Sequence, residues 1–149
     1  MLEYYTDGAA SNNKTRCGGW AWVYEDENNR VFMERGSATN TTNNRMEMQA
    51  LIAAMEDAVR LQETATFYTD SAYLANCFNQ KWYDKWEKNN WMTSKRTPVL
   101  NVDLWVRLLE LYRNNNFKVV HVKGHSTNKL NNLADKFAVE ARKMMEDNL

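Results

Sequence analysis

Two aspartates lie in nearly identical short motifs, and this repetition is the first sign of a site that could do chemistry. Asp7 lies in the motif Tyr5-Thr6-Asp7-Gly8, and Asp70 lies in the motif Tyr68-Thr69-Asp70-Ser71. In open α/β sheets the carboxyl ends of strands line the ligand crevice, so two aspartates that follow strands can lie side by side there. Either aspartate alone is better explained as a turn or helix-capping residue. The repetition favours a shared function.

Two further carboxylates occupy positions in predicted helices. Glu47 stands three residues after Asn44 at the start of an apolar-striped helix, which is the spacing of a capping box. Its functional alternative is a third carboxylate that faces the strand ends. Asp135 lies between Ala134 and Phe137, close to a buried stripe, where a carboxylate needs a partner or a metal. For a single helical aspartate the ordinary alternative is a solvated position.

The four acids occur without a Cys/His ligand cluster, which favours Mg²⁺ or Mn²⁺ over structural zinc. Two such ions about 3.5–4 Å apart can activate a water and stabilise the leaving oxygen of an in-line phosphodiester displacement. Four carboxylates would offset most of the charge of two divalent cations. Spacing alone does not establish this site, because the fold must first bring the acids together.

Residues 81–96 form a local basic segment in a chain whose formal net charge is zero. Its lysines at helical spacing and its tryptophans are Lys81, Lys85, Lys88, Trp82, Trp86 and Trp91. An amphipathic helix with its tryptophans in the core explains the pattern. The functional alternative is a platform for a sugar–phosphate backbone, with lysines at phosphates and aromatic rings against sugars.

The elements that must position these residues follow from hydrophobic periodicity. The predicted strands are 2–6, 20–24, 31–35, 64–69 and 117–122. The predicted helices are 44–59, 71–78, 80–88, 102–113 and about 128–145. A hairpin followed by strand–helix alternation predicts a mixed α/β sheet with helices on its faces, because a helical crossover places strands in parallel.

Composition limits the number of domains and the compartment. The 149 residues, 44% of them hydrophobic, suffice for one domain with its own core. The zero net charge gives no general attraction to polyanions, so such a partner must be met by a local patch. Cys17 and Cys77 lack metal-ligand spacing and fit a reduced compartment. The sequence has neither the apolar run of a signal peptide nor about 18 apolar residues for a membrane span, so we expect a cytoplasmic protein without membrane contact.

Five sequence motifs, which occur in the family's order, resemble those of ribonuclease H of type 1, close to its bacterial form. They are Thr6-Asp7-Gly8, Thr41-Thr42-Asn43-Asn44-Arg45-Met46-Glu47, Thr69-Asp70-Ser71, Asn101-Val102-Asp103-Leu104-Trp105, and Val122-Lys123-Gly124-His125 followed by Ala134-Asp135. The resemblance implies the ribonuclease H-like fold, a five-stranded mixed sheet of order 3-2-1-4-5 with helices on both faces. It implies a single domain over residues 1–149, without a separate hybrid-binding domain.

The resemblance also implies an activity and its catalytic residues. The implied enzyme is an endonuclease that hydrolyses the RNA strand of RNA/DNA hybrids with two Mg²⁺ ions, or Mn²⁺ as a substitute, and leaves 5′-phosphate and 3′-hydroxyl ends. The implied metal-binding catalytic acids are Asp7, Glu47, Asp70 and Asp135. His125 is implied to assist proton transfer or phosphate release, a role that suits the ordinary histidine pKa of about 6.5. Without the resemblance, it is a solvated loop histidine.

Residues that contact the hybrid follow from the same resemblance. Short polar side chains would distinguish 2′-hydroxyls from deoxyribose in the minor groove, and the implied set is Thr42, Asn43, Asn44, Arg45 and Gln49. Each is equally explained as a cap or turn residue. The 81–96 segment resembles the basic protrusion that grips the DNA strand, which favours a monomer that needs no protein partner. The 9–17 loop departs from the Gly- and Pro-rich loop of many bacterial members, so its contacts with RNA stay open.

Two other classes of function compete with this interpretation. A non-catalytic nucleic-acid-binding module on the same fold would not need the four acids. An enzyme with the same metal chemistry that acts on DNA, as related resolvases and transposases do, would cut without ribonucleotides.

Overall fold

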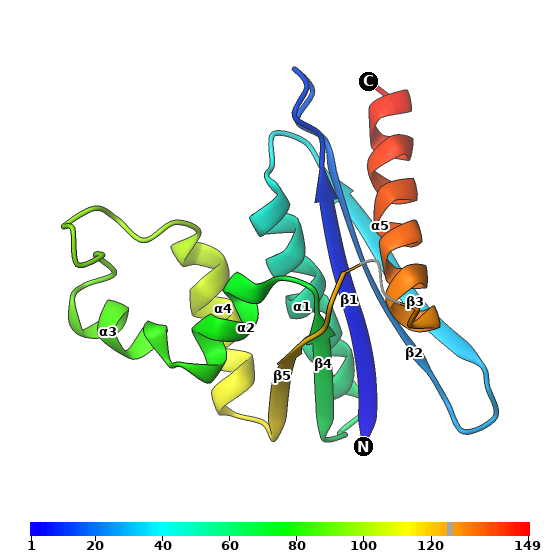
Figure 1. Ribbon diagram of the computed structural model, residues 1–149, viewed down its shortest axis with the longest axis horizontal. Coiled ribbons are helices and arrows are strands. Elements are labelled where there is room, and N and C mark those ends of the chain that lie inside the picture. Colours follow the sequence, from blue (N-terminus) through cyan, green and yellow to red (C-terminus); the bar gives the residue numbers. More distant parts are fainter. Residues whose placement is uncertain (125–126) are drawn as a thin grey trace.

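The computed structural model describes residues 1–124 and 127–149, and a five-stranded sheet forms its centre (Figure 1). The strands are β1 (Leu2–Ala10), β2 (Gly18–Glu25), β3 (Val31–Ala38), β4 (Ala65–Thr69) and β5 (Phe117–His121). Their order is β3-β2-β1-β4-β5. The β1–β2 and β2–β3 pairs are antiparallel, whereas β1–β4 and β4–β5 are parallel. The mixed sheet and its predicted order are confirmed.

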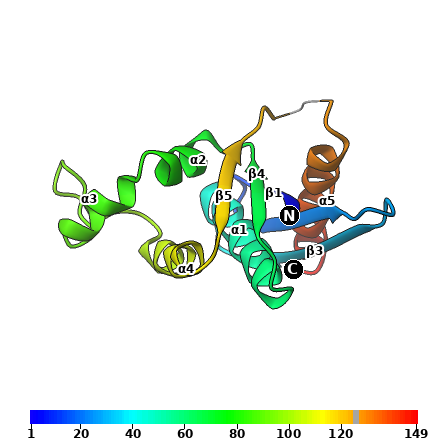
Figure 2. The same ribbon diagram turned by 90° about the horizontal axis from the view of Figure 1, so that it is seen from below.

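Helices cover both faces of this sheet. They are α1 (Asn43–Arg60), α2 (Ala72–Asn79), α3 (Trp82–Lys88), α4 (Val102–Arg113) and α5 (Lys129–Asp147). Helix α5 lies on one face, α1 and α4 lie on the other, and α3 projects away from the sheet (Figures 1 and 2). The β2 glycines show the two faces: a Cβ on Gly18 would meet Met46 of α1, and one on Gly19 would lie 2.2 Å from the Ala138 oxygen of α5.

None of the helices within the described residues combines the length and the apolar character needed to cross a membrane.

The predicted apolar stripe of α1 is buried against the sheet. Met48, Leu51 and Met55 are fully buried, and Ile52 is nearly so. Val59 is 39% exposed because it lies in the last turn of the helix. Burial of this stripe fixes the rotation of α1, and the rotation decides which way the first turn of the helix faces.

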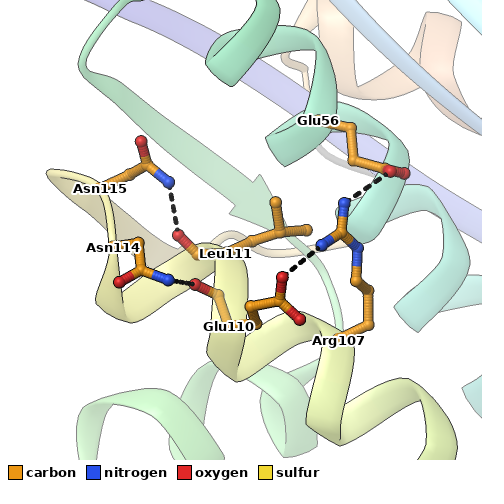
Figure 3. A network of polar contacts seen from close by, with 6 residues as sticks. All are labelled: Glu56, Arg107, Glu110, Leu111, Asn114 and Asn115. Atoms are coloured by element: carbon orange, nitrogen blue, oxygen red, sulfur yellow. Dashed lines mark hydrogen bonds and ion pairs between the residues drawn. The ribbon is translucent and has the colours of Figure 1, made fainter.

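Helix α4 is tied to α1 by polar contacts. Figure 3 shows the network formed by Glu56, Arg107, Glu110, Leu111, Asn114 and Asn115. Arg107 bridges the two helices, since its guanidinium donates to Glu56 of α1 at 3.0 Å and to Glu110 of α4 at 3.0 Å. The two asparagines beyond the helix donate to carbonyls four residues earlier, both at 2.8 Å, and thereby satisfy the last turn.

A buried hydrogen bond joins β1 to α1. The Tyr4 hydroxyl donates to Asp57 Oδ2 at 2.7 Å, and both residues are buried. Burial, and then the bond to Asp57, raise the pKa of Tyr4, so the hydroxyl keeps its proton and remains a donor. This bond holds the strand that carries Asp7 against the helix that carries Glu47.

We expect Tyr4→Phe to lower the free energy of unfolding by about 1–3 kcal/mol, because the buried Asp57 carboxylate loses a donor. Urea unfolding followed by circular dichroism measures the change. Tyr68→Phe is the matched control, since Tyr68 bonds to Glu3 at an exposed site and its loss should cost under about 1 kcal/mol. Equal losses in the two variants would contradict the role of the buried bond.

Candidate active site

Strand β1 extends past the end of β4, and the candidate site lies at this point. β4 ends at Thr69, which pairs with Thr6, whereas β1 continues beside β2 until Ala10 pairs with Gly18. The predicted strand 2–6 is therefore too short, because pairing with β2 extends it. Asp7 lies within β1, directly after the last residue of this strand that pairs with β4.

The first turns of α1 approach β1 closely at Gly8. A Cβ on Gly8 would lie 2.4 Å from the backbone nitrogen of Glu47, a distance that no side chain permits. The Gly8 N–H donates to Glu47 Oε1 at 2.9 Å and to Asp7 Oδ1 at 2.8 Å. The Thr69 hydroxyl donates to Glu47 Oε2 at 3.4 Å. These donors hold the buried Glu47 carboxylate against the strand ends.

The capping-box interpretation of Glu47 is wrong. Helix α1 begins at Asn43, and its N-cap is Thr42, whose Oγ1 accepts from the Arg45 N–H at 3.2 Å. Asn44 is therefore inside the helix, and Glu47 bonds to Gly8 of β1 instead of to the cap.

The structure brings together the acids that the sequence singled out. Asp7, Glu47 and Asp70 each place one carboxylate oxygen within 4.8 Å of the others. Asp135 of α5 lies outside this group of three but interacts with Asp7 and raises its pKa. All four line one cavity of about 470 Å³. The cluster offers only oxygen ligands, which suits a hard divalent cation.

The electrostatics of the cluster favour a bound cation. The pKa of Asp7 is raised to about 7, chiefly by burial and further by the charge of Asp70 and the hydrogen bond with Asp135, although bonds with Glu47 and Gly8 lower it. Burial, and then the proximity of Asp7 and Asp70, raise the pKa of Glu47 well above its ordinary value. A divalent cation would reverse these shifts, because it stabilises the ionised carboxylates.

The polar residues around the start of α1 lie beside this cavity. The Asn43 side chain accepts from the Ala10 N–H at 2.6 Å and so ties the helix to the end of β1. Asn43 and Asn44 line both the acidic cavity and a second cavity next to it. Thr42 lines the second cavity and also caps the helix.

Arg45 and Gln49 lie farther from the acids. The Arg45 guanidinium forms two hydrogen bonds to Asp103, at 3.0 and 2.8 Å, and one to Asn101 at 3.1 Å. The motif at Asn101–Trp105 is thus joined through side chains to the motif at residues 41–47. Gln49 is half-buried and lines another cavity with Arg45.

The basic segment presents its lysines to solvent and turns its acids toward α4. Lys81, Lys85 and Lys88 are exposed and form no ion pair within residues 1–124 and 127–149. Glu87 accepts two hydrogen bonds from Arg113, which also lies 3.6 Å from Asp84. The predicted helix 80–88 begins only at Trp82, because Lys81 adopts a left-handed conformation with φ of 54°.

The tryptophans of this segment hold it against the core. Trp86 contacts Trp82 and Trp91 with ring centroids 6.4 Å apart in each pair, and it meets the buried Trp105 at 5.6 Å. Trp82, Trp86 and Trp91 are half-buried, so each also keeps an exposed part. Their packing role is clear, and contact with a ligand stays a prediction.

His125 lies outside the described residues. Its chain neighbour Gly124 lies against the acidic cluster, since a Cβ on Gly124 would be 3.3 Å from Asp70 Oδ2.

Several residues that were not predicted as site residues also line the acidic cavity, namely Ser71, Asn131, Asn132 and Arg142. Arg142 lies seven residues after Asp135 on α5. Because seven residues make two helical turns, both side chains occupy one face of the helix, and this spacing is the signal that identifies Arg142.

Comparisons with known proteins agree on one family. The family model described as RNase H matches residues 1–143. A protein named Ribonuclease H from Caldanaerobacter subterraneus subsp. tengcongensis is 45% identical over 142 residues, covering 94% of this chain and 90% of the relative. RNase H1 from the archaeon Halobacterium salinarum NRC-1 is 25% identical with a TM-score of 0.66, covering 98% of each chain.

A structure of the foamy viral protease-reverse transcriptase in complex with RNA/DNA hybrid resembles this chain in fold. The TM-score is 0.81 at 24% identity, and the match covers 96% of this chain but only 20% of the viral chain.

The raised pKa of Asp7 predicts a pH-dependent cost in the metal-free protein. An aspartate in the unfolded chain has a pKa of about 4. Asp7 therefore stabilises the fold fully below this pH and loses that contribution as the pH rises to about 7. We therefore expect Asp7→Asn to become more stable relative to the parent across this range, by about 1–4 kcal/mol. Urea unfolding in a chelator measures both proteins.

The matched control is Asp147→Asn, at an exposed carboxylate near the end of α5. Its pH curve separates the effect of the cluster from the loss of a carboxylate elsewhere on the protein. Parallel pH curves for Asp7→Asn and the parent would contradict the electrostatic account of the cluster.

Proposed function

Because this chain belongs to the ribonuclease H family, we propose that it is an endonuclease that hydrolyses the RNA strand of RNA/DNA hybrids. The observation that carries the proposal is the cluster of Asp7, Glu47 and Asp70, with Asp135 at the same cavity. These acids come from β1, α1, the end of β4 and α5, so only the complete fold assembles them.

The donor set fits divalent metal ions. Asp7, Glu47, Asp70 and Asp135 offer oxygen ligands alone, and burial first, with the neighbouring carboxylates second, raises the pKa values of Asp7 and Glu47, which a bound cation would lower again. Bound Mg²⁺ ions, or Mn²⁺ in their place, would supply an activated water and charge stabilisation for the departing 3′ oxygen, which leaves 5′-phosphate and 3′-hydroxyl ends.

The protein's own groups hold this site in one geometry. The Gly8 N–H and the Thr69 hydroxyl fix the two oxygens of Glu47, so this ligand does not need to reorganise when the substrate binds. Gly124 leaves room beside Asp70, and the adjacent His125 would transfer a proton or assist release of the cleaved phosphate.

Recognition of the hybrid would use two surfaces. Asn43 and Asn44 line the acidic cavity and present amides that can hydrogen-bond 2′-hydroxyls, with Thr42, Arg45 and Gln49 beside them. The exposed lysines of α3 and its N-cap would contact the DNA strand, because Arg113 already engages Asp84 and Glu87. The exposed parts of Trp82, Trp86 and Trp91 would rest against sugars there.

We expect cleavage of end-labelled RNA in an RNA/DNA hybrid with Mg²⁺, and none in single-stranded RNA, RNA/RNA or DNA/DNA. Asp70→Asn should reduce the rate by at least about 100-fold while the protein stays folded, because it removes a charged metal ligand. Asp147→Asn, an exposed carboxylate on α5, should cut like the parent. Gel-resolved cleavage measures the rates, and circular dichroism checks the fold.

Two outcomes would overturn the proposal in different ways. Full Mg²⁺-dependent activity of Asp70→Asn would exclude the carboxylate cluster as the catalytic site. A folded parent protein that binds the hybrid but does not cut it, even with Mn²⁺, would indicate a binding module, and cutting of DNA/DNA would indicate a DNA nuclease.

We expect Lys85→Ala to weaken hybrid binding uniformly across sequences and to lower the slope of log affinity against log salt by about one, because it removes a phosphate contact. Titrations in Ca²⁺ allow binding with little cleavage, since the larger ion suits tight octahedral geometry poorly. Lys118→Ala, an exposed lysine on β5, is the matched control. An unchanged salt slope for Lys85→Ala would refute the contact.

A further inference from the structure

The acidic cavity has one cation among the described residues that line it. Its lining comprises four carboxylate residues, several small or amide residues, and Arg142. A polyanionic substrate that enters such a cavity meets repulsion wherever metal ions do not neutralise the acids. A single guanidinium at this place therefore has a large local effect.

Arg142 stands beside the part of β1 that extends beyond the acids. A Cβ on Gly19 would lie 2.5 Å from the Arg142 backbone nitrogen, and Gly19 pairs with Ala9. Asp135 precedes Arg142 by two turns, or about 10.5 Å along α5. Helix α5 packs against β1, and both residues line the acidic cavity, so they mark successive levels of it along α5.

The Arg142 guanidinium is held in place but keeps unused donors. Its Nε lies 3.7 Å from Glu146 Oε1, which is an ion pair beyond hydrogen-bond distance. Nε is buried and has no hydrogen-bond acceptor within the part of the chain that the structure describes. The side chain is 25% exposed. An arginine in this state is free to donate to an anionic oxygen.

We propose that Arg142 binds a phosphate of the RNA strand next to the scissile one, and so sets the register of the strand over the acids. The inference rests on the proposed ribonuclease H activity of the same cavity. A planar guanidinium matches phosphate oxygens in a fork, and the distance along α5 keeps it away from the reacting bond. Arg142 is thus a substrate-positioning residue.

A purely structural role predicts a different outcome. An ion pair between partly exposed Arg142 and Glu146 contributes little to stability, so its loss alone should alter neither the KM for the hybrid nor the salt dependence. These two quantities therefore separate substrate binding from packing.

The experiment compares Arg142→Ala with Lys143→Ala, which removes the same charge at the next, exposed position of α5. For Arg142→Ala we expect KM for the hybrid to rise about tenfold, kcat to stay within about twofold, and the salt slope of binding in Ca²⁺ to fall by about one. Arg142→Lys should restore the salt slope but only part of KM, because it keeps the charge without the fork. Lys143→Ala should match the parent.

Hybrids with one neutral methylphosphonate at successive RNA positions locate the contact. In the parent, one position beside the scissile phosphate should weaken binding, and Arg142→Ala should show no further loss at that position. Parent-like KM and salt slope in folded Arg142→Ala, or additive losses at every phosphate, would overturn the proposal.

These readouts also separate the inference from the proposed function. A parent protein that binds hybrids without cutting them would refute the nuclease proposal, yet the salt slope in Ca²⁺ would still test the Arg142 contact.

Discussion

The close approach of α1 to β1 at Gly8 is the constraint on which the rest of the site depends. Any side chain at this position would strike the backbone of Glu47, so a glycine is required for the contact itself. With the helix this near, the Gly8 N–H, which β4 no longer covers, donates to Glu47. The Tyr4–Asp57 bond holds the same two elements together farther along. The carboxylates of β1 and α1 are thus positioned by backbone contacts and core packing.

The cost of this arrangement is electrostatic. Burial and mutual proximity raise the pKa values of Asp7 and Glu47, which means that the folded protein disfavours their ionised forms. Arg142, the one cation in the described lining, has its Nε 3.7 Å from Glu146 Oε1 and forms no hydrogen bond to it. An electrostatic cost of this kind is typical of functional sites, where a bound ligand compensates for it. Rigid strands and a long helix sustain it, because they leave the acids little freedom to separate.

Local patterns predicted the helices and strands well, and nonlocal contacts account for the errors. Helix 102–113 has the predicted bounds because its apolar stripe is strongly periodic. The sheet order came from family resemblance, since periodicity does not encode it. The predicted C-terminal end of β1 was wrong because pairing with β2 extends the strand to Ala10, and the predicted cap of α1 was wrong because the Thr42 hydroxyl accepts from the Arg45 N–H. Trp91 has a φ of 60°, and its backbone hydrogen bonds with Trp86 and Val99 accompany the ring packing against Trp86, so sequence propensity could not reveal this conformation.

The distribution of charge explains how a chain of zero net charge can engage a polyanion. Arg113 draws Asp84 and Glu87 toward α4, which leaves the lysines of the projecting α3 facing solvent. Helices α3 and α5 lie toward opposite ends of the long axis (Figure 2), with the acidic cavity beside α5. A duplex carries phosphates on two strands and can contact both regions at once. A single flexible strand loses more conformational entropy when it contacts both regions. Under the proposed function, selection of duplex over single strand thus follows from the separation of the two regions, and discrimination between RNA and DNA is left to the polar residues beside the cavity.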